Sequence, residues 1–177
     1  MIDMQVTLSQ SDLDRMVRSL GLLPEALQRA ARRAVRKTAK WTETTAARAM
    51  SADLKVQQKI IRARLRTYAR GTGLEQKVWL GLNALAANRL GVPRRKGSGT
   101  QVGRHFLDGA FPIKRFGNGV YRRTGADRFP LELAKVEIDK AGERALRAAA
   151  THAEARLLEL LRQEMNYELS KTLRSAK

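Results

Sequence analysis

The most constraining feature of the sequence is a stretch from Pro24 to about Met50 that has no glycine, and no proline after its first residue. Small and apolar residues recur along it at spacings of three and four, the period of a helix with one buried face. Proline suits the first turn of such a helix. The pattern predicts one long amphipathic helix whose buried stripe consists of Leu23, Leu27, Ala30, Ala34, Thr38, Trp41, Thr45 and Ala49.

The opposite face of this predicted helix is strongly basic. It carries six cations, namely Arg29, Arg32, Arg33, Arg36, Lys37 and Lys40. Such a row would line a groove of a nucleic-acid duplex or one wall of a channel, and its contacts would go to phosphates, which carry no sequence information. A solvated face, or a surface that meets acidic neighbouring proteins, explains the row equally well. Both interpretations stay open from the sequence.

Shorter elements are predicted on either side of the long helix. Residues 1–22 begin with an alternation typical of a strand, followed by a short helix that ends near Leu20. Beyond Met50 the sequence predicts a second basic helix, closed by glycines at positions 71 and 73. Its candidate polyanion-binding or partner-binding cations are Lys55, Lys59 and Arg62. Residues 23–70 are therefore predicted to form one basic helical segment.

The period changes in residues 71–138, which are predicted to form a β region. Residues 77–82 have the composition of a strand. Residues 91–100 combine glycine, proline and serine with three further candidate cations, Arg94, Arg95 and Lys96. Glycines beside cations can cradle a phosphate, but Gly-Ser-Gly is also a flexible linker. The sequence favours a mobile basic loop over a defined anion pocket.

A β-hairpin is predicted at residues 110–124. Its turn contains Gly117, Asn118 and Gly119, and Asn-Gly between apolar runs is the strongest short-range hairpin signal. The return strand carries two more candidate cations, Arg122 and Arg123. Residues 130–138 predict a further strand. The six aromatic residues of this region are expected to lie in the core; they are Trp79, Phe106, Phe111, Phe116, Tyr121 and Phe129.

The C-terminal segment, residues 139–177, is predicted to be one helix with a stripe of alanine and leucine. Gly142 and the region of residues 166–167 are the expected sites of a kink. Together the segments predict a single α+β domain in which a long N-terminal and a long C-terminal helix pack on a small antiparallel sheet.

Positive charge is distributed unevenly along the chain. The sequence has 35 Lys and Arg against 17 Asp and Glu, a formal net charge of +18. Residues 23–70 contribute 13 basic and 3 acidic side chains, and residues 71–138 contribute 12 and 5, whereas residues 139–177 contribute 8 and 6. Such a chain attracts polyanions. The near-neutral C-terminal helix suits packing or a contact between protein subunits.

Several function classes are disfavoured by the sequence. There are no cysteines, which excludes disulfides and thiolate metal sites. No apolar run approaches the roughly 20 residues that span a bilayer, so no membrane partner is expected, and no signal peptide is predicted.

Catalytic motifs are also lacking. His105 and His152 lie far apart, no phosphate-binding or nucleophile motif occurs, and carboxylates are scarce in the β region. A nuclease would need clustered carboxylates to bind metal ions. The prediction is a protein that is not an enzyme and uses no cofactor.

Two segments carry a resemblance to a known family. The first is the run from Lys55 to Leu65, in which Lys-Val is followed by Lys59 and an apolar pair. The second combines Gly-Ala-Phe-Pro-Ile at 109–113, Gly-Asn-Gly-Val-Tyr-Arg-Arg at 117–123 and Arg-Phe-Pro-Leu at 128–131. In order and spacing these resemble the lambda-type minor tail protein Z family of phages and prophages, over about residues 30–173.

The resemblance implies a structural virion protein, assembled in the cytoplasm of the bacterial host, that acts late in tail assembly. It implies a subunit of a tail-completion or neck ring at the head-proximal end of the tail. The expected ring is a hexamer. The implied partners are the tail terminator, the tail tube or neck proteins, further copies of the chain and DNA in the lumen. The implied roles are tail completion, head–tail joining and positioning of the genome end. The alternative is a free-standing, sequence-independent nucleic-acid-binding protein.

Overall fold

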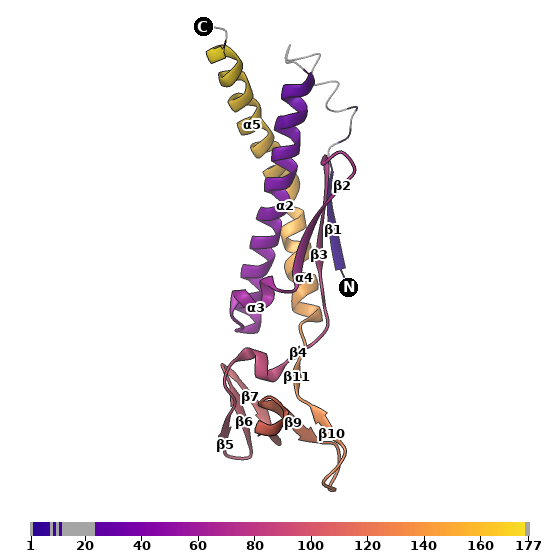
Figure 1. Ribbon diagram of the computed structural model, residues 1–177, viewed down its shortest axis with the longest axis vertical. Coiled ribbons are helices and arrows are strands. Elements are labelled where there is room, and N and C mark those ends of the chain that lie inside the picture. The colour runs from indigo at the N-terminus through magenta and orange to yellow at the C-terminus, as the bar shows by residue number, and fades with distance from the viewer. Residues whose placement is uncertain (1, 8, 10, 12–23, 176–177) are drawn as a thin grey trace.

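Long helices form most of one half of the molecule, called here the helical half (Figure 1). The computed structural model describes residues 2–7, 9, 11 and 24–175. Helix α2 (Pro24–Leu54) runs antiparallel to the C-terminal helices and packs along both α4 (Asp139–Thr151) and α5 (Ala153–Ser175). The long helix predicted from Pro24 is present within these residues, and the predicted single C-terminal helix is divided into two. The short helix predicted within residues 1–22 falls largely outside the described residues.

The C-terminal helix is interrupted at His152, whereas α4 and α5 remain helical through Gly142 and through residues 166–167, where kinks were predicted. The His152 N–H donates to the Ala149 carbonyl oxygen at 3.3 Å, which ends α4 before α5 begins. Gly142 has a packing role instead. A Cβ at this position would lie 2.8 Å from a methyl carbon of Leu82, so the absent side chain lets α4 approach the sheet closely.

A three-stranded antiparallel sheet flanks the helices. Its order is β1 (Ile2–Thr7), β3 (Glu75–Leu80) and β2 (Leu65–Arg70). The second basic helix was therefore predicted too long. Only α3 (Gln58–Arg62) is helical, and residues 65–70 form a strand in register with β3. The ladder of backbone hydrogen bonds to β3 outweighs the weak local helical preference of those residues.

The core of the helical half is built from small side chains. Ala34, Ala39 and Ala46 of α2 are completely buried, so its neighbours approach the helix backbone closely. The predicted stripe is correct in its first half, but Ala49 is exposed whereas Ala46 and Met50 are buried. The stripe shifts because the second half of α2 is covered by α4 and the sheet rather than by α5.

The remaining strands form a second body at the end of the long axis, called here the β lobe (Figure 1). Two short antiparallel strands, β4 (Leu85–Ala86) and β11 (Lys135–Val136), connect it to the helical half, and the 3₁₀ helix η1 (Ala87–Leu90) follows β4. The lobe contains two three-stranded sheets. The first sheet consists of β5 (Arg94–Lys96), β6 (Gly99–Val102) and β7 (His105–Asp108). The second sheet consists of β8 (Ala110–Ile113), β9 (Gly119–Arg123) and β10 (Leu131–Leu133).

Residues 91–100 do not form the predicted mobile loop. Arg94–Lys96 and Gly99–Gln101 pair as a tight hairpin, and Gly97 adopts a left-handed φ of 55° at its turn. Glycine reaches such a conformation without a steric penalty. The Gly-Ser-Gly sequence therefore serves a turn between strands rather than a linker.

The hairpin predicted at residues 110–124 is confirmed. β8 pairs with β9 so that Ile113 lies opposite Gly119. The 3₁₀ helix η2 (Lys114–Phe116) occupies the first part of the connection, and Gly117 and Asn118 complete it with left-handed φ values of 63° and 56°. The strand predicted at residues 130–138 is instead divided into β10 and β11 by the buried Ala134.

The aromatic residues of the β lobe are not its core. Phe106, Phe116 and Phe129 are 49%, 55% and 63% exposed, so this expectation is wrong for them. The interior between the two small sheets is instead filled by small residues, including the fully buried Thr100 and Val120. The observed fold is mixed helix and sheet with antiparallel sheets, but the sheets are split between the two halves of the molecule.

Candidate interaction site

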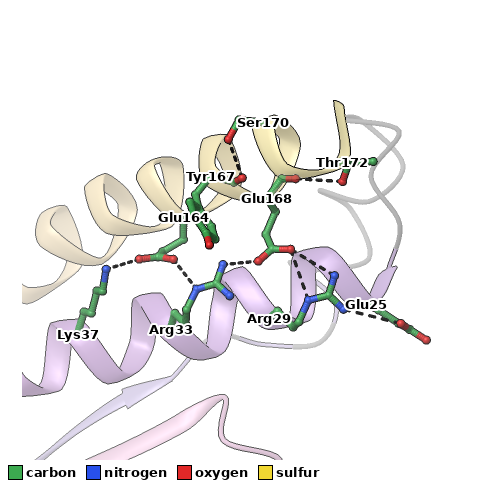
Figure 2. A network of polar contacts seen from close by, with 9 residues as sticks. All are labelled: Glu25, Arg29, Arg33, Lys37, Glu164, Tyr167, Glu168, Ser170 and Thr172. Atoms are coloured by element: carbon green, nitrogen blue, oxygen red, sulfur yellow. Dashed lines mark hydrogen bonds and ion pairs between the residues drawn. The ribbon is translucent and has the colours of Figure 1, made fainter. Parts of the chain in front are cut away.

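The face of α2 that was predicted to bind polyanions is partly covered by α5 (Figure 2). Arg33 pairs with Glu164 and with Glu168, at 2.5 and 2.6 Å. Lys37 pairs with Glu164 at 2.5 Å and Arg29 with Glu168 at 3.2 Å. The two glutamates lie one turn apart on α5 and form a ladder of ion pairs between the helices. Three of the six predicted cations therefore have acidic partners on α5.

The carboxylates of this ladder are themselves almost completely buried, with 7% and 3% of the Glu164 and Glu168 side chains exposed. Burial alone would raise their pKa values, but the hydrogen bonds from Arg33 and from Lys37 or Arg29 outweigh it and hold both pKa values below the ordinary range. The same two carboxylates raise the pKa of Arg33 despite its partial burial. Both glutamates are thus charged at neutral pH.

The sequence did not identify these glutamates as functional or structural partners. Their spacing of four residues beside Leu161 and Met165 on the apolar side of α5 was the available signal, because it places both carboxylates where the partner helix packs. Tyr167 adds to the contact, with its ring centroid 5.3 Å from the Arg33 guanidinium carbon.

The rest of the predicted α2 face opens onto a groove beside β2 and α3. Arg36, Lys40 and Arg62 line this groove of about 620 Å³, together with Arg66. Glu43 is the acid at its base, and it accepts hydrogen bonds from Lys40 and Thr67. The structure thus brings cations of two predicted segments together. Arg32 lies apart, next to Gln28 on the exposed side of α2.

A second basic hollow lies in the β lobe. It has a volume of about 880 Å³ and gathers the predicted residues Arg95, Arg122 and Arg123 from two different hairpins. The Arg123 guanidinium carbon lies 5.8 Å from the centroid of the half-buried Phe111 ring. Within the described residues, no ion pair neutralises any of these three arginines. This hollow is the strongest candidate anion site of the chain.

One carboxylate stands at the rim of this hollow. Asp108 lines it and accepts a hydrogen bond of 2.6 Å from the Ser98 hydroxyl. Arg95 is partly engaged as well, because its guanidinium donates to the Ala110 carbonyl oxygen at 3.3 Å. Arg122 and Arg123 line the hollow without an ion pair among the described residues and so remain available to an anion.

The remaining predicted cations occupy other surfaces. Lys55 is exposed at the turn after α2, with a left-handed φ of 53°. Lys59 lines a separate hollow between α3 and β4. Arg94 and Lys96 are exposed on β5.

Metal-binding clusters and membrane-spanning helices are absent from the part of the chain that the structure describes. No group of three or more His, Asp or Glu side chains is placed to hold a metal ion there. No helix among the described residues is long and apolar enough to cross a bilayer.

Comparison with protein families decides which family the chain belongs to. The model of the family described as prophage minor tail protein Z (GPZ) matches residues 12–177. The chain belongs to the prophage minor tail protein Z family. The family resemblance drawn from the sequence is therefore confirmed, and the chain is a structural component of a phage tail. Searches of curated proteins and of solved structures gave no match.

Proposed function

We propose that this minor tail protein Z family member is a non-enzymatic subunit of a ring that completes the head-proximal end of the tail. In this proposal it contacts the tail terminator and the tail tube or neck proteins, and it helps to join the head and to position the genome end. It assembles in the host cytoplasm and remains in the virion. The family resemblance implies a hexamer, and contacts between unlike surfaces close into a ring of this kind when their rotation matches the symmetry axis.

The observation that supports this proposal most is the distribution of neutralised charge. In the helical half, α5 supplies buried carboxylates to α2. In the β lobe, Arg95, Arg122 and Arg123 face a hollow without ion pairs among the described residues. One end of the elongated molecule is thus suited to packing and the other to a polyanion, as a subunit between a protein tube and a lumen would require.

The groove beside β2 is proposed as the contact for an acidic neighbouring tail protein. It combines Arg36, Lys40, Arg62 and Arg66 with the apolar Leu65 at its floor. Electrostatic complementarity of this kind selects partners and orients them. The exposed Lys55 and Lys59 extend the same basic character toward the junction with the β lobe.

Genetic complementation tests this function. In the phage or prophage that encodes the chain, an early stop codon inactivates the gene. A plasmid then supplies either the wild-type protein or the groove variant Arg36→Gln/Arg62→Gln/Arg66→Gln. We expect the null mutant to yield tails that fail to join heads, as counted by electron microscopy, and we expect the groove variant to complement poorly. Arg144→Gln/Arg147→Gln/Arg162→Gln, which removes three exposed arginines from α4 and α5, is the matched control. Infectious, fully joined particles from the null mutant would refute the proposal.

A further inference from the structure

The outward face of the β5–β6–β7 sheet carries cations and an aromatic ring together. Arg94 and Phe106 both lie in register with Gln101, and Lys96 lies in register with Gly99. Residues opposite one another in an antiparallel sheet project to the same side, and so do alternate residues of one strand. Arg94, Lys96 and Phe106 therefore share one face of the sheet.

This face is the solvent side. The neighbouring positions Thr100 and Val102 project to the other side and are completely buried. The Thr100 hydroxyl donates to the Ala110 carbonyl oxygen at 2.7 Å, which ties the inner side to β8. Phe106, at 49% exposure, is thus an aromatic residue displayed on the outside of a sheet that has its own packed interior.

The Phe106 ring reaches across β6. Its Cζ atom lies 2.9 Å from the position that a Cβ on Gly99 would occupy, and Gly99 is buried. The ring therefore covers the glycine and extends along the sheet. An aromatic ring that lies on a sheet with one face free offers a platform for stacking a nucleic-acid base.

The basic hollow of the β lobe adjoins this platform. Ser98 and Asp108, at the end of the β6–β7 ladder beside Gly99, line the hollow together with Arg122 and Arg123. Asp108 shares the outer side of the sheet with Phe106 by the alternation along β7 and also lines the hollow, so the hollow adjoins the stacking face at this end of the sheet. Asp108 is the one carboxylate among the residues that line the hollow.

We propose that the β lobe binds single-stranded nucleic acid, with a base stacked on Phe106 and backbone phosphates held by Arg122 and Arg123. Arg94 and Lys96 contribute further positive charge along the strand path. Binding of this kind is largely independent of sequence, because every base has a flat face and every nucleotide a phosphate. The inference rests on the proposed function only in taking a polyanion as the ligand of this lobe.

Other occupants fit this region less well. A duplex keeps its bases stacked inside, so the free face of Phe106 would gain nothing from it. A second copy of the chain is disfavoured at this lobe, because Glu164 and Glu168 of α5 are already paired. An acidic protein would pair with the arginines but would not need an exposed, flat ring beside them.

Fluorescence anisotropy with the full chain tests the inference. The probes are a labelled oligo-deoxythymidine of about 20 nucleotides, a duplex of the same length and polyglutamate, each titrated at several salt concentrations. We expect the oligonucleotide to bind more tightly than the duplex. We also expect log K to fall steeply and linearly with the logarithm of the salt concentration.

Matched variants separate stacking from charge. We expect Phe106→Ala to weaken oligonucleotide binding roughly 5- to 100-fold with an unchanged salt slope, whereas Tyr68→Ala, an exposed aromatic of the helical half, has no effect. Arg122→Gln/Arg123→Gln should make the salt slope shallower by about 1.4. The control Arg162→Gln/Arg174→Gln removes two exposed charges from α5 and should leave the slope nearly unchanged. Asp108→Asn should tighten binding.

Three results would overturn the inference. Equal binding of duplex and oligonucleotide with no effect of Phe106→Ala would reduce the region to a non-specific phosphate surface. Binding of polyglutamate in preference to the oligonucleotide would indicate an acidic protein partner. Absence of oligonucleotide binding at low salt, with circular dichroism showing folded protein, would refute the site directly. Because the assay needs no tail, its failure is distinguishable from failure of complementation.

Discussion

The helical half and the β lobe carry their positive charge in different ways. In the helical half, three cations of α2, namely Arg29, Arg33 and Lys37, meet buried glutamates of α5 and hold the two helices together. In the β lobe, the arginines of β5 and β9 face a hollow. Three phenylalanines of the lobe, Phe106, Phe116 and Phe129, are exposed. The same residue type thus serves packing in one half and remains available for binding in the other. The difference shows that net charge alone does not locate a binding surface.

The largest expected effect on stability comes from comparing a buried side chain of the helical half with an exposed side chain of the β lobe. Leu146 of α4 is 1% exposed, so we expect Leu146→Ala to lower the free energy of unfolding by about 2–5 kcal/mol through lost burial and a cavity. Phe129→Ala in the β lobe removes a larger side chain, but that side chain is 63% exposed. We therefore expect the free energy of unfolding to change by less than about 0.5 kcal/mol. Urea denaturation followed by circular dichroism measures both. Similar losses of stability for Leu146→Ala and Phe129→Ala would contradict the difference between the buried side chain of the helical half and the exposed one of the β lobe.

The ion-pair ladder provides the second test. Glu164→Gln/Glu168→Gln leaves Arg29, Arg33 and Lys37 without their acidic partners on α5. We expect a loss of about 2–4 kcal/mol, less than for fully buried pairs because the cations keep contact with water. Glu154→Gln, at an exposed position of the same helix, is the control and should stay within about 0.5 kcal/mol of the wild type. Equal stability of the double variant and the control would show that the ladder contributes nothing to helix packing.

The pH dependence of stability sharpens the same comparison. The pKa values of Glu164 and Glu168 are lowered on folding, so the unfolded state binds their protons more readily. Their stabilising contribution is full above the ordinary carboxylate pKa of about 4.3 and is lost as the pH falls through the lower folded values. The stability difference between the wild type and Glu164→Gln/Glu168→Gln should therefore be largest near neutral pH and should shrink toward pH 3. A constant difference would assign the effect to packing rather than charge.

The smallest expected effect concerns the turn of the β8–β9 hairpin. Gly117 has a left-handed φ of 63° and open space around it, so Gly117→Ala should cost about 1 kcal/mol from backbone strain alone. Gly125 also has open space but lies outside the left-handed region, and Gly125→Ala should be neutral or slightly stabilising. Thermal unfolding of both variants measures the contrast. Oligonucleotide affinity should not change in either, because neither glycine lines the arginine hollow.

Local patterns predicted the elements whose residues interact with near neighbours. The spacing of alanine and leucine predicted α2, and Asn-Gly between apolar runs predicted the β8–β9 hairpin. The strand β2 was missed because residues 65–70 have no clear alternation of their own. Their conformation is determined by β3, to which they pair in register.

The candidate site was predicted only in its composition. The sequence identified Arg95, Arg122 and Arg123 as cations but not their convergence, since the two hairpins that carry them meet only in the folded lobe. It assigned Phe106 to the core because aromatic residues in strands are usually buried. The small residues that fill the lobe instead left that ring outside.

By itself, the sequence determined the excess of positive charge, the long helix α2, the β8–β9 hairpin and the family resemblance. Each depends on residue types and on short spacings, which local backbone geometry converts directly into structure. Only the tertiary structure decided which cations are neutralised and which aromatic ring is free. Arg33 and Glu168 are 135 positions apart, and their pairing depends on how α5 packs on α2. Such distant contacts arise from packing, which no local spacing specifies.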